Sequence, residues 1–352
     1  MLNRLRAVAR FFQVTIGWHR IGVLLSLAII AVALVVLFHS LRGLDVGQVI
    51  AALKATERRN IVAAGLFVAA AYFSLTFYDW FALRTIGRND IPYRIAMLGA
   101  FTSYAVGHNV GATVFTGGAV RYRIYSAHGL NAIEVAKICF IAGLTFWLGN
   151  ATVLGLSVAF EPQAAGPIDQ LPDWLNRGIA IAILCVLISY VGWVWSASRA
   201  IGRHGWQVRL PSGPSTLLQI CIGLLDLGCC TLAMYMLLPQ GPHIGFVTLT
   251  VVFVSATLLG FASHAPGGLG VFDAAMLVAL WQFEKEDIVA GLLLFRLLYY
   301  ITPFIIALTI LGVREIVLSA RKAQTRANPE AVSAAAPLRS ELDKKPKKSG
   351  SK

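Results

Sequence analysis

Two long apolar stretches, each interrupted by a Gly-Gly pair, decide the fold. Residues 95–121 read IAMLGAFTSYAVGHNVGATVFTGGAVR, and residues 244–281 read IGFVTLTVVFVSATLLGFASHAPGGLGVFDAAMLVALW. Both are long enough to cross a bilayer, which takes about 20 apolar residues in a helix. A break in such a helix exposes backbone groups, and a membrane tolerates them only where protein or a cavity surrounds them. We therefore expect two broken, re-entrant segments that line a site within a membrane domain.

The remainder of the chain is similarly apolar. Of its 352 residues, 57% are hydrophobic and only 13% are charged, whereas soluble domains carry about 25% charged residues. This composition excludes an ordinary cytoplasmic enzyme, a disordered protein and a DNA-binding domain. We predict an all-α polytopic membrane protein with six to eight transmembrane helices. Besides the two interrupted stretches, the candidate spans are residues 21–41, 61–83, 136–160, 178–198, 215–238 and 288–313.

The placement of charges predicts the orientation, because cytoplasmic loops carry an excess of Lys and Arg. The N-terminal segment, residues 1–20, has four arginines, and residues 315–352 form a basic tail that we expect to be disordered. The 161–177 loop is acidic and should lie outside, whereas the 199–214 loop is basic and should lie inside. We therefore expect a bacterial inner-membrane protein with both termini in the cytoplasm. The basic residues at 54–59 oppose this assignment.

An internal repeat links the two interrupted stretches. The Gly-Gly pair at 117–118 follows Asp79 by 38 residues, and the pair at 267–268 follows Asp226 by 41 residues. Halves that enter the membrane from opposite sides, with sites at broken helices, are typical of inverted-repeat transporters. The alternative is two unrelated Gly-rich helix-packing seams. The predicted membrane domain covers residues 21–314, with repeat halves at 21–160 and 178–314.

Charged side chains inside the predicted spans are the main candidates for a site. Each costs at least about 2.5–3.5 kcal/mol at the centre of a bilayer. Such residues form either a structural ion-pair network or a polar cavity that holds a charged head group or relays protons, and the sequence alone leaves both interpretations open. The five residues are Asp79, Arg121, Asp226, Asp273 and Arg296.

The glycine pairs suggest how a phosphate would be held. Backbone N–H groups approach a ligand closely at glycine, the N-terminus of a following half-helix attracts anions, and the guanidinium of Arg121 matches a phosphate. With Asp273 in the corresponding place of the second half, the cavity suits a zwitterionic or aminoacylated head group. The predicted backbone cradle consists of Thr116, Gly117, Gly118, Pro266, Gly267, Gly268 and Gly270.

Motifs for a cofactor or a metal are missing from the sequence. It has no P-loop, no G-x-G-x-x-G after a strand and no H-E-x-x-H, and its five cysteines lie in apolar runs. We therefore expect no cofactor, no metal and no nucleic-acid partner. An integral lipid transferase with Asp79 or Asp226 as general base is disfavoured, because no donor site is apparent.

Three segments resemble a known family. TGGAVRYRIYSAHGL at 116–130, SHAPGGLGVFDAAML at 263–277 and FRLLYYITPF at 295–304 are similar to the transmembrane region of lysylphosphatidylglycerol synthetases. The resemblance implies a flippase fold and assigns the five membrane charges to the family's charged positions. The sequence departs from the family in having no soluble synthetase domain, so we expect a stand-alone member that is not an enzyme.

The resemblance leads to two functional hypotheses. The first is a flippase-like lipid translocator for an anionic, aminoacylated or lipid-linked phosphate head group. The second is a non-catalytic accessory membrane protein of a lipid, hopanoid or cell-envelope biosynthesis pathway. Membrane lipids are the expected partners in the first hypothesis, and a separate lipid-modifying enzyme is an additional partner in the second.

Overall fold

The computed structural model describes residues 45–203, 206–239 and 241–327, and within these ranges it is almost entirely helical. Six helical segments there are long and apolar enough to cross a membrane, which confirms the predicted all-α polytopic class. The predicted span at 21–41 and the segment 1–20 lie outside the described residues. The six segments are α4 (Arg58–Thr85), α7 (Ala132–Phe160), α9 (Asp173–Ser196), α10 (Gly213–Leu237), α11 (Phe246–Ser263) and the continuous helix Lys285–Val317.

Shorter elements connect these spans. The continuous helix consists of α13 (Lys285–Phe295), the π-helical turn η4 (Arg296–Ile301) and the first part of α14 (Thr302–Ala327). An antiparallel hairpin, β1 (Ala200–Arg203) and β2 (Trp206–Arg209), joins α9 to α10. The others are α3 (Val46–Ala55), α5 (Tyr93–Val110), α6 (Thr113–Tyr125), η1 (Ser126–His128), η2 (Pro162–Ala165), α8 (Gly166–Asp169), η3 (Pro266–Gly268) and α12 (Val271–Ala279).

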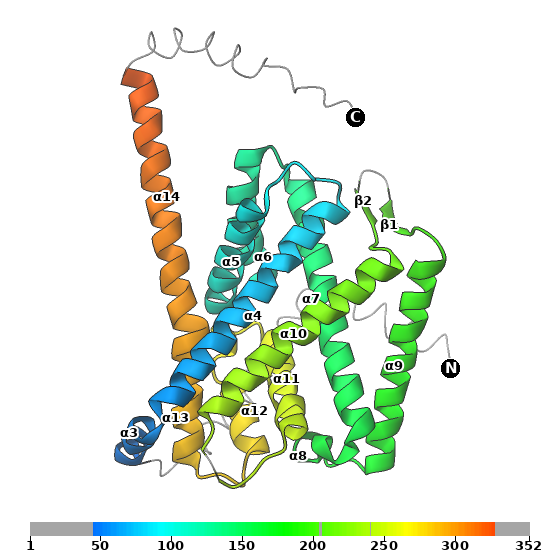
Figure 1. Ribbon diagram of the computed structural model, residues 1–352, viewed down its shortest axis with the longest axis vertical. Coiled ribbons are helices and arrows are strands. Elements are labelled where there is room, and N and C mark those ends of the chain that lie inside the picture. The colour runs from blue at the N-terminus through cyan, green and yellow to red at the C-terminus, as the bar shows by residue number, and fades with distance from the viewer. Residues whose placement is uncertain (1–44, 204–205, 240, 328–352) are drawn as a thin grey trace, which may run out of the picture. The chain divides into compact units, whose positions relative to one another are not determined.

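The long helices α4 and α10 form the centre of the residue 45–304 part. They pack side by side and run in opposite directions, with the α5–α6 hairpin near one end and α11–α12 near the other (Figure 1). Small buried residues on α4, such as Ala64, Ala71 and Ala82, allow this close packing. The helix α7, which packs on α10, begins at a capping box in which Asn131 and Glu134 bond each other's backbone N–H groups.

At one point α7 and α10 approach so closely that neither helix has room for a side chain. A Cβ atom on Gly149 would lie 2.8 Å from the Cα of Gly223, and one on Gly223 would lie 2.7 Å from the Cα of Gly149. The backbones of the two helices therefore touch directly. Close approach through paired small residues is a common way for membrane helices to associate.

The two interrupted segments meet tip to tip. The first turns at Gly111 (φ 83°) and Ala112 (φ 44°), between α5 and α6; the second turns from His264 (φ 57°) through Gly267 (φ 59°) into α12. A Cβ atom on Gly111 would lie 3.1 Å from the N and Cα atoms of Pro266. The peptide backbones of the two turns are thus in contact.

This geometry corrects one prediction. The first break is not at Gly117-Gly118, because both glycines lie inside the regular helix α6. A Cβ atom on Gly117 would lie 3.1 Å from the carbonyl oxygen of Ser103, so this glycine serves the close packing of α6 on α5. The second break does coincide with the predicted pair at 267–268.

The backbone conformation of Gly111 leads to a testable prediction. Its φ of 83° and ψ of −179° fall in a region that is essentially restricted to glycine, and a methyl group there would meet Pro266 at 3.1 Å. Gly111→Ala is expected to lower the free energy of unfolding by about 2–3 kcal/mol. Thermal unfolding of the detergent-purified protein measures this loss.

Gly118→Ala is the matched control for that experiment, because its Cβ atom would make an ordinary contact of 3.6 Å with Sγ of Cys139. It lies in a helix, where alanine is preferred to glycine, so its melting temperature should equal or exceed that of the wild type. Equal melting temperatures for Gly111→Ala and Gly118→Ala would contradict the tip-to-tip contact.

The chain divides into two compact units, residues 1–304 and 305–352. Helix α14 continues to Ala327, so residues 315–327 are helical rather than disordered as predicted. Residues 328–352, the rest of the predicted tail, lie outside the described ranges.

The loop between α4 and α5 is fixed by a charged network outside the spans. Arg88 donates to Asp90 at 3.0 Å, to Glu134 at 3.0 Å and to the carbonyl of His128 at 2.9 Å. The hydrogen bond from Arg88 lowers the pKa of the Asp90 carboxyl. This network ties the loop to the start of α7.

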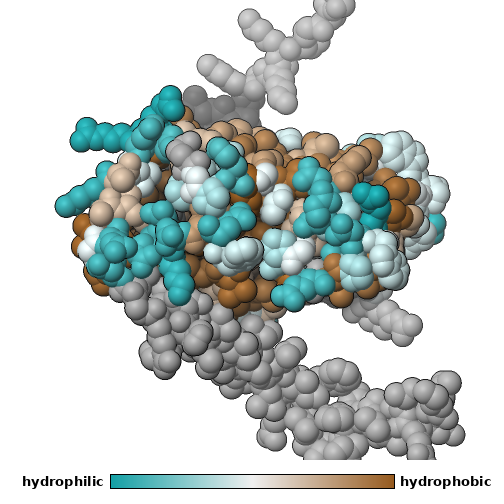
Figure 2. Space-filling view, turned by 90° about the horizontal axis from the view of Figure 1, so that it is seen from below, coloured by the Kyte–Doolittle hydropathy of each residue, from teal (hydrophilic) through white to brown (hydrophobic). Residues whose placement is uncertain are grey.

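At the opposite end of the molecule, near α3, polar side chains also gather, with apolar side chains around them (Figure 2).

Candidate functional site

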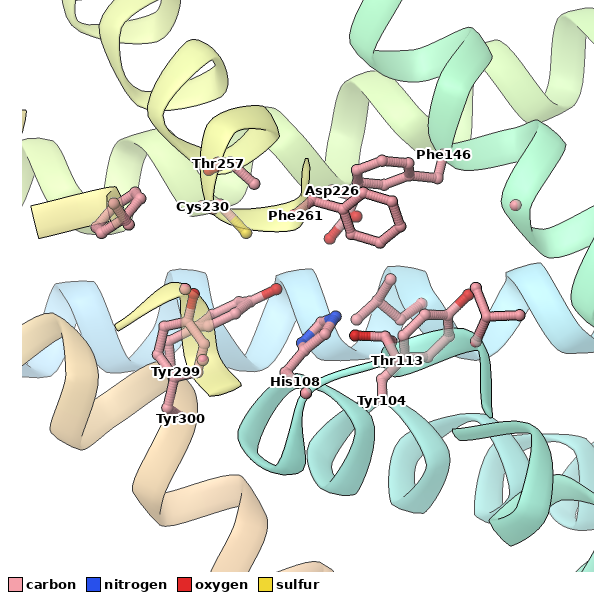
Figure 3. Close-up of a pocket in the computed structure, with 18 of the residues that line it drawn as sticks. Tyr104, His108, Thr113, Phe146, Asp226, Cys230, Thr257, Phe261, Tyr299 and Tyr300 are labelled. Atoms are coloured by element: carbon pink, nitrogen blue, oxygen red, sulfur yellow. The ribbon is translucent and has the colours of Figure 1, made fainter. Parts of the chain in front are cut away.

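A pocket of about 270 Å³ lies where the two hairpin turns meet. In Figure 3, Tyr104, His108 and Thr113 from the first hairpin face Asp226 from α10 and Phe261 from α11. Residues of α4, α7, α12, α13 and η4 complete the walls. Polar groups thus converge in a space whose other walls are mainly apolar and include the aromatic side chains Phe115, Phe146, Trp147, Phe253, Phe261, Phe272 and Phe295.

The wall next to α6 contains a buried ion pair. Nε of Arg121 donates to both carboxylate oxygens of Asp79 at 2.9 and 3.0 Å, and Nη2 donates to Oδ1 at 2.8 Å. The Asp79 side chain is completely buried and that of Arg121 is 5% exposed. The Tyr125 hydroxyl donates to Asp79 at 2.7 Å, and the guanidinium lies 4.7 Å from the ring centre of Tyr104. These contacts compensate the desolvation of both charges.

Arg121 reaches the pocket while Asp79 does not. The bonds to Asp79 use Nε and Nη2 of Arg121 and do not involve Nη1. Arg121 lines the pocket, whereas Asp79 lies behind it. The arrangement holds one fixed, charged guanidinium at the pocket wall with its orientation set by a carboxylate.

A second ion pair stands at the other break. Arg296 donates from Nε and Nη2 to Asp273 at 3.0 and 2.6 Å, and from Nη1 to the carbonyl of Gly267 at 3.2 Å. Asp273 also accepts the N–H of Gly270 at 3.0 Å, which caps α12. Both side chains of this pair are partly exposed. Arg296 and Asp273 therefore hold the shape of the second turn.

Asp226 is the one of the five charged residues that forms no ion pair among the described residues. The residue is 5% exposed and lines the pocket, and its Oδ2 atom accepts a hydrogen bond from the Tyr78 hydroxyl at 3.3 Å. Its other oxygen, Oδ1, has no hydrogen-bond partner within the described part of the chain. A buried carboxylate oxygen without a partner is costly, so this atom is available to a proton, a cation or a ligand ammonium group.

The structure divides the five charged residues between two arrangements. The interpretation as a structural network fits Asp79, Arg121, Asp273 and Arg296, which form two ion pairs. The interpretation as a polar cavity fits Arg121 and Asp226, the two of the five that line the pocket.

The predicted backbone cradle is only partly at the pocket. Gly267 and Gly268 line it, with left-handed φ values of 59° and 60°. Thr116, Gly117 and Gly118 do not line it, because α6 begins at Thr113, and the Thr116 hydroxyl donates to the carbonyl of Gly111 at 2.8 Å. Neither Pro266 nor Gly270 is among the lining residues.

Several lining residues were not among the predicted site residues. His108 stacks on Tyr299 with ring centroids 5.9 Å apart, and its Nδ1 atom has no hydrogen-bond partner among the described residues. Tyr299 and Tyr300 line the pocket from η4. The π-helical turn is a signal for such a site, since these turns occur frequently at functional positions.

Metal binding finds no support in the side chains of residues 45–203, 206–239 and 241–327. No group of three His, Cys, Asp or Glu residues there is arranged to hold a metal ion. Cys230, one of the five cysteines in apolar runs, lines the pocket.

Comparison with known proteins identifies the family. The lysylphosphatidylglycerol synthase TM region model matches residues 23–307. The chain is 30% identical over 265 residues to the inner membrane protein YbhN of Escherichia coli, covering 72% of this chain and 79% of YbhN. It is 27% identical over 285 residues to the uncharacterized protein slr0712 of Synechocystis, covering 80% and 88% of the two chains.

A third relative contains the same region within a longer protein. The phosphatidylglycerol lysyltransferase of Staphylococcus haemolyticus is 25% identical over 353 residues, which cover 91% of this chain but 36% of the lysyltransferase. The match thus covers about a third of that protein. With the apolar helices and the opposed hairpins described above, these similarities show that the chain is a multi-pass membrane protein that belongs to the lysylphosphatidylglycerol synthase TM region family.

Proposed function

We propose that this protein translocates a lipid whose head group carries a phosphate, either an anionic or aminoacylated phospholipid or a lipid-linked phosphate. The observation that carries the proposal is the pocket between the two hairpin turns, which has Arg121 and Asp226 in its walls. Sites at broken helices between opposed repeats are typical of transporters. The guanidinium of Arg121 suits a phosphate, and the free oxygen of Asp226 suits an ammonium group or a proton.

The size and lining of the pocket also suit a lipid head group. Its volume of about 270 Å³ is near the lower limit for pockets that bind small molecules. Its walls combine two charged side chains with many aromatic ones. Amphiphiles, rather than fully polar solutes, match such a lining.

Charges at the two ends of the residue 45–304 unit support an orientation. The segments 84–94, 123–137 and 199–209 lie at one end and carry eight Lys or Arg residues against two Asp or Glu residues. The segments 45–59, 161–177 and 284–287 lie at the opposite end and carry five against eight. By the positive-inside rule, the first end faces the cytoplasm.

Lys54, Arg58 and Arg59 therefore no longer oppose this orientation, because acidic residues outnumber basic ones when all charges at their end are counted. We propose the inner membrane of a bacterium as the location, with both termini in the cytoplasm. We also propose that the role is not enzymatic, since the chain matches stand-alone relatives over most of their length.

Asp226→Asn tests the proposal with little change of shape. Asp226 has no ionic partner among the described residues, so its neutralisation should leave the melting temperature unchanged or raise it. Loss of a charge-assisted contact worth about 1.5–3 kcal/mol should slow translocation by about tenfold or more. A leaflet-exposure assay in proteoliposomes measures the rate with fluorescent phosphatidylglycerol, its aminoacylated form and a polyprenyl phosphate.

Glu57→Gln is the control, because this carboxylate is exposed and its nearest cationic group, in Arg59, is 3.7 Å away. Transport at the wild-type rate is expected. If the purified wild-type protein moves none of the three probes, the proposal that it translocates lipid is wrong. The accessory role beside a separate lipid-modifying enzyme then takes its place.

A further inference from the structure

The pocket has one side on which its lining residues are strongly exposed. Phe115 is 81% exposed, Val114 60%, Trp147 54% and Phe261 38%, although all four line the pocket. The rings of Phe146, Trp147 and Phe261 contact one another with centroid distances of 5.4–6.3 Å. We call this opening the lateral portal, formed by Val114 and Phe115 of α6, Gly143, Phe146 and Trp147 of α7, and Phe261 of α11.

The depth of the lateral portal identifies what lies outside it. Phe146 is the middle residue of α7, which spans Ala132–Phe160. At 1.5 Å per residue, it lies about 21 Å from either end of the helix. The hydrocarbon core of a bilayer is about 30 Å thick. Because α7 is long enough to cross the membrane, the lateral portal beside its middle residue opens into hydrocarbon rather than into water or the head-group region.

The polarity of the pocket changes from its interior to the portal. Arg121 and Asp226 are buried inside, whereas the side chains of the lateral portal are Val, Phe and Trp, with the exposed, uncharged ring of His264 stacked on Phe261 beside them. In Figure 3, Phe146 and Phe261 lie at the opposite end of the pocket from Tyr299 and Tyr300. A ligand that fits this gradient has a charged group at one end and hydrocarbon at the other.

We propose that the lateral portal is the binding site for the hydrocarbon chains of the transported lipid, which enters the pocket sideways from the membrane core. This proposal rests on the proposed function. It adds the route by which the head group enters the pocket and names the part of the lipid that stays in the bilayer. A volume of about 270 Å³ accommodates a head group but not acyl chains, each of which is about 15 Å long, half of the thickness of the hydrocarbon core. The chains therefore remain in the bilayer and pack against Phe115 and Trp147.

Gly143 offers a way to close the portal. A Cβ atom at this position would have no neighbour within 4 Å, so a larger side chain can be accommodated there and would project into the opening. Gly192 on α9 is the matched control, since it is also helical, equally free of neighbours and not a lining residue. The variants are Gly143→Trp, Gly143→Leu and Gly192→Trp.

The experiment uses the full-length protein in proteoliposomes that contain phosphatidylglycerol with a diazirine near the end of one acyl chain. After irradiation, mass spectrometry maps the labelled residues. Labelling is expected to concentrate on residues 114–115, 146–147 and 261, to fall at least tenfold in Gly143→Trp and to remain unchanged in Gly192→Trp. Labelling spread evenly over lipid-facing residues of the wild type would overturn the proposal, and this outcome depends on no variant.

A transport assay on the same samples separates the two proposals. If Gly143→Trp melts like the wild type and transports lipid at the same rate, the portal is wrong while translocation stands. If the wild type shows focused labelling but moves no lipid, the portal stands and the translocator proposal fails. Should Gly143→Trp not fold, Gly143→Leu gives the same comparison with a smaller side chain, and retained labelling in a folded Gly143→Leu would count against the portal.

Discussion

Arg121→Ala is expected to be among the most damaging single substitutions in the protein. Removing one partner of a buried pair costs about 3–5 kcal/mol, because the other charge stays buried without compensation. Asp79 is completely buried and, among the residues that the structure describes, would retain only the hydrogen bond from Tyr125. The expected result is low accumulation in the membrane and a large drop in the melting temperature of any protein that is recovered.

A double variant separates the structural cost from the functional one. Asp79→Asn combined with Arg121→Gln removes both charges, so it should recover much of the stability but not the transport of lipid. Arg296→Ala is the comparison at the second break, where Asp273 keeps a bond from the N–H of Gly270 and is 16% exposed; its loss of stability should be smaller. If Arg121→Ala melts like the wild type and only transport is lost, Arg121 serves the ligand and not the fold.

The second large effect is expected at the contact between α7 and α10. Gly149→Val and Gly223→Val each place side-chain atoms less than 3 Å from the backbone of the other helix, which cannot move aside as a flexible side chain would. Overpacking costs about 1–3 kcal/mol or more, and here it separates two membrane-spanning helices. Both variants should accumulate poorly and melt early in detergent.

Gly228→Val provides the control on the same helix, α10. A Cβ atom at Gly228 has no neighbour within 4 Å, so the substitution should be tolerated. Wild-type melting temperatures for Gly149→Val or Gly223→Val would show that the two helices are farther apart than the structure indicates.

The sequence was sufficient to predict the class and most spans because a long apolar run has few alternatives to a membrane helix. The second break was also predictable, since Pro266 removes a backbone donor. The first was misplaced by six residues because glycine pairs are tolerated inside membrane helices, and Gly117-Gly118 is such a pair.

The composition of the site was more accessible to sequence analysis than its pairing. The cost of membrane charges identified Asp79, Arg121, Asp226, Asp273 and Arg296 as a group. Which carboxylate meets which guanidinium depends on how the helices are placed in three dimensions, and no spacing revealed that Asp226 alone would be unpaired within the described residues. His108 is a weaker candidate from the sequence, because an uncharged ring on an apolar helix gives no comparable signal.

The contact between Gly111 and Pro266 has an electrical consequence. A lipid that passes these two turns on its way across the membrane carries the charge of its head group through the membrane potential. Moving one elementary charge through a potential of 100 mV is worth about 2.3 kcal/mol. With the interior of the cell negative, an anionic lipid would be driven outward past these turns, a zwitterionic one would feel no net force, and a cationic one would be held back.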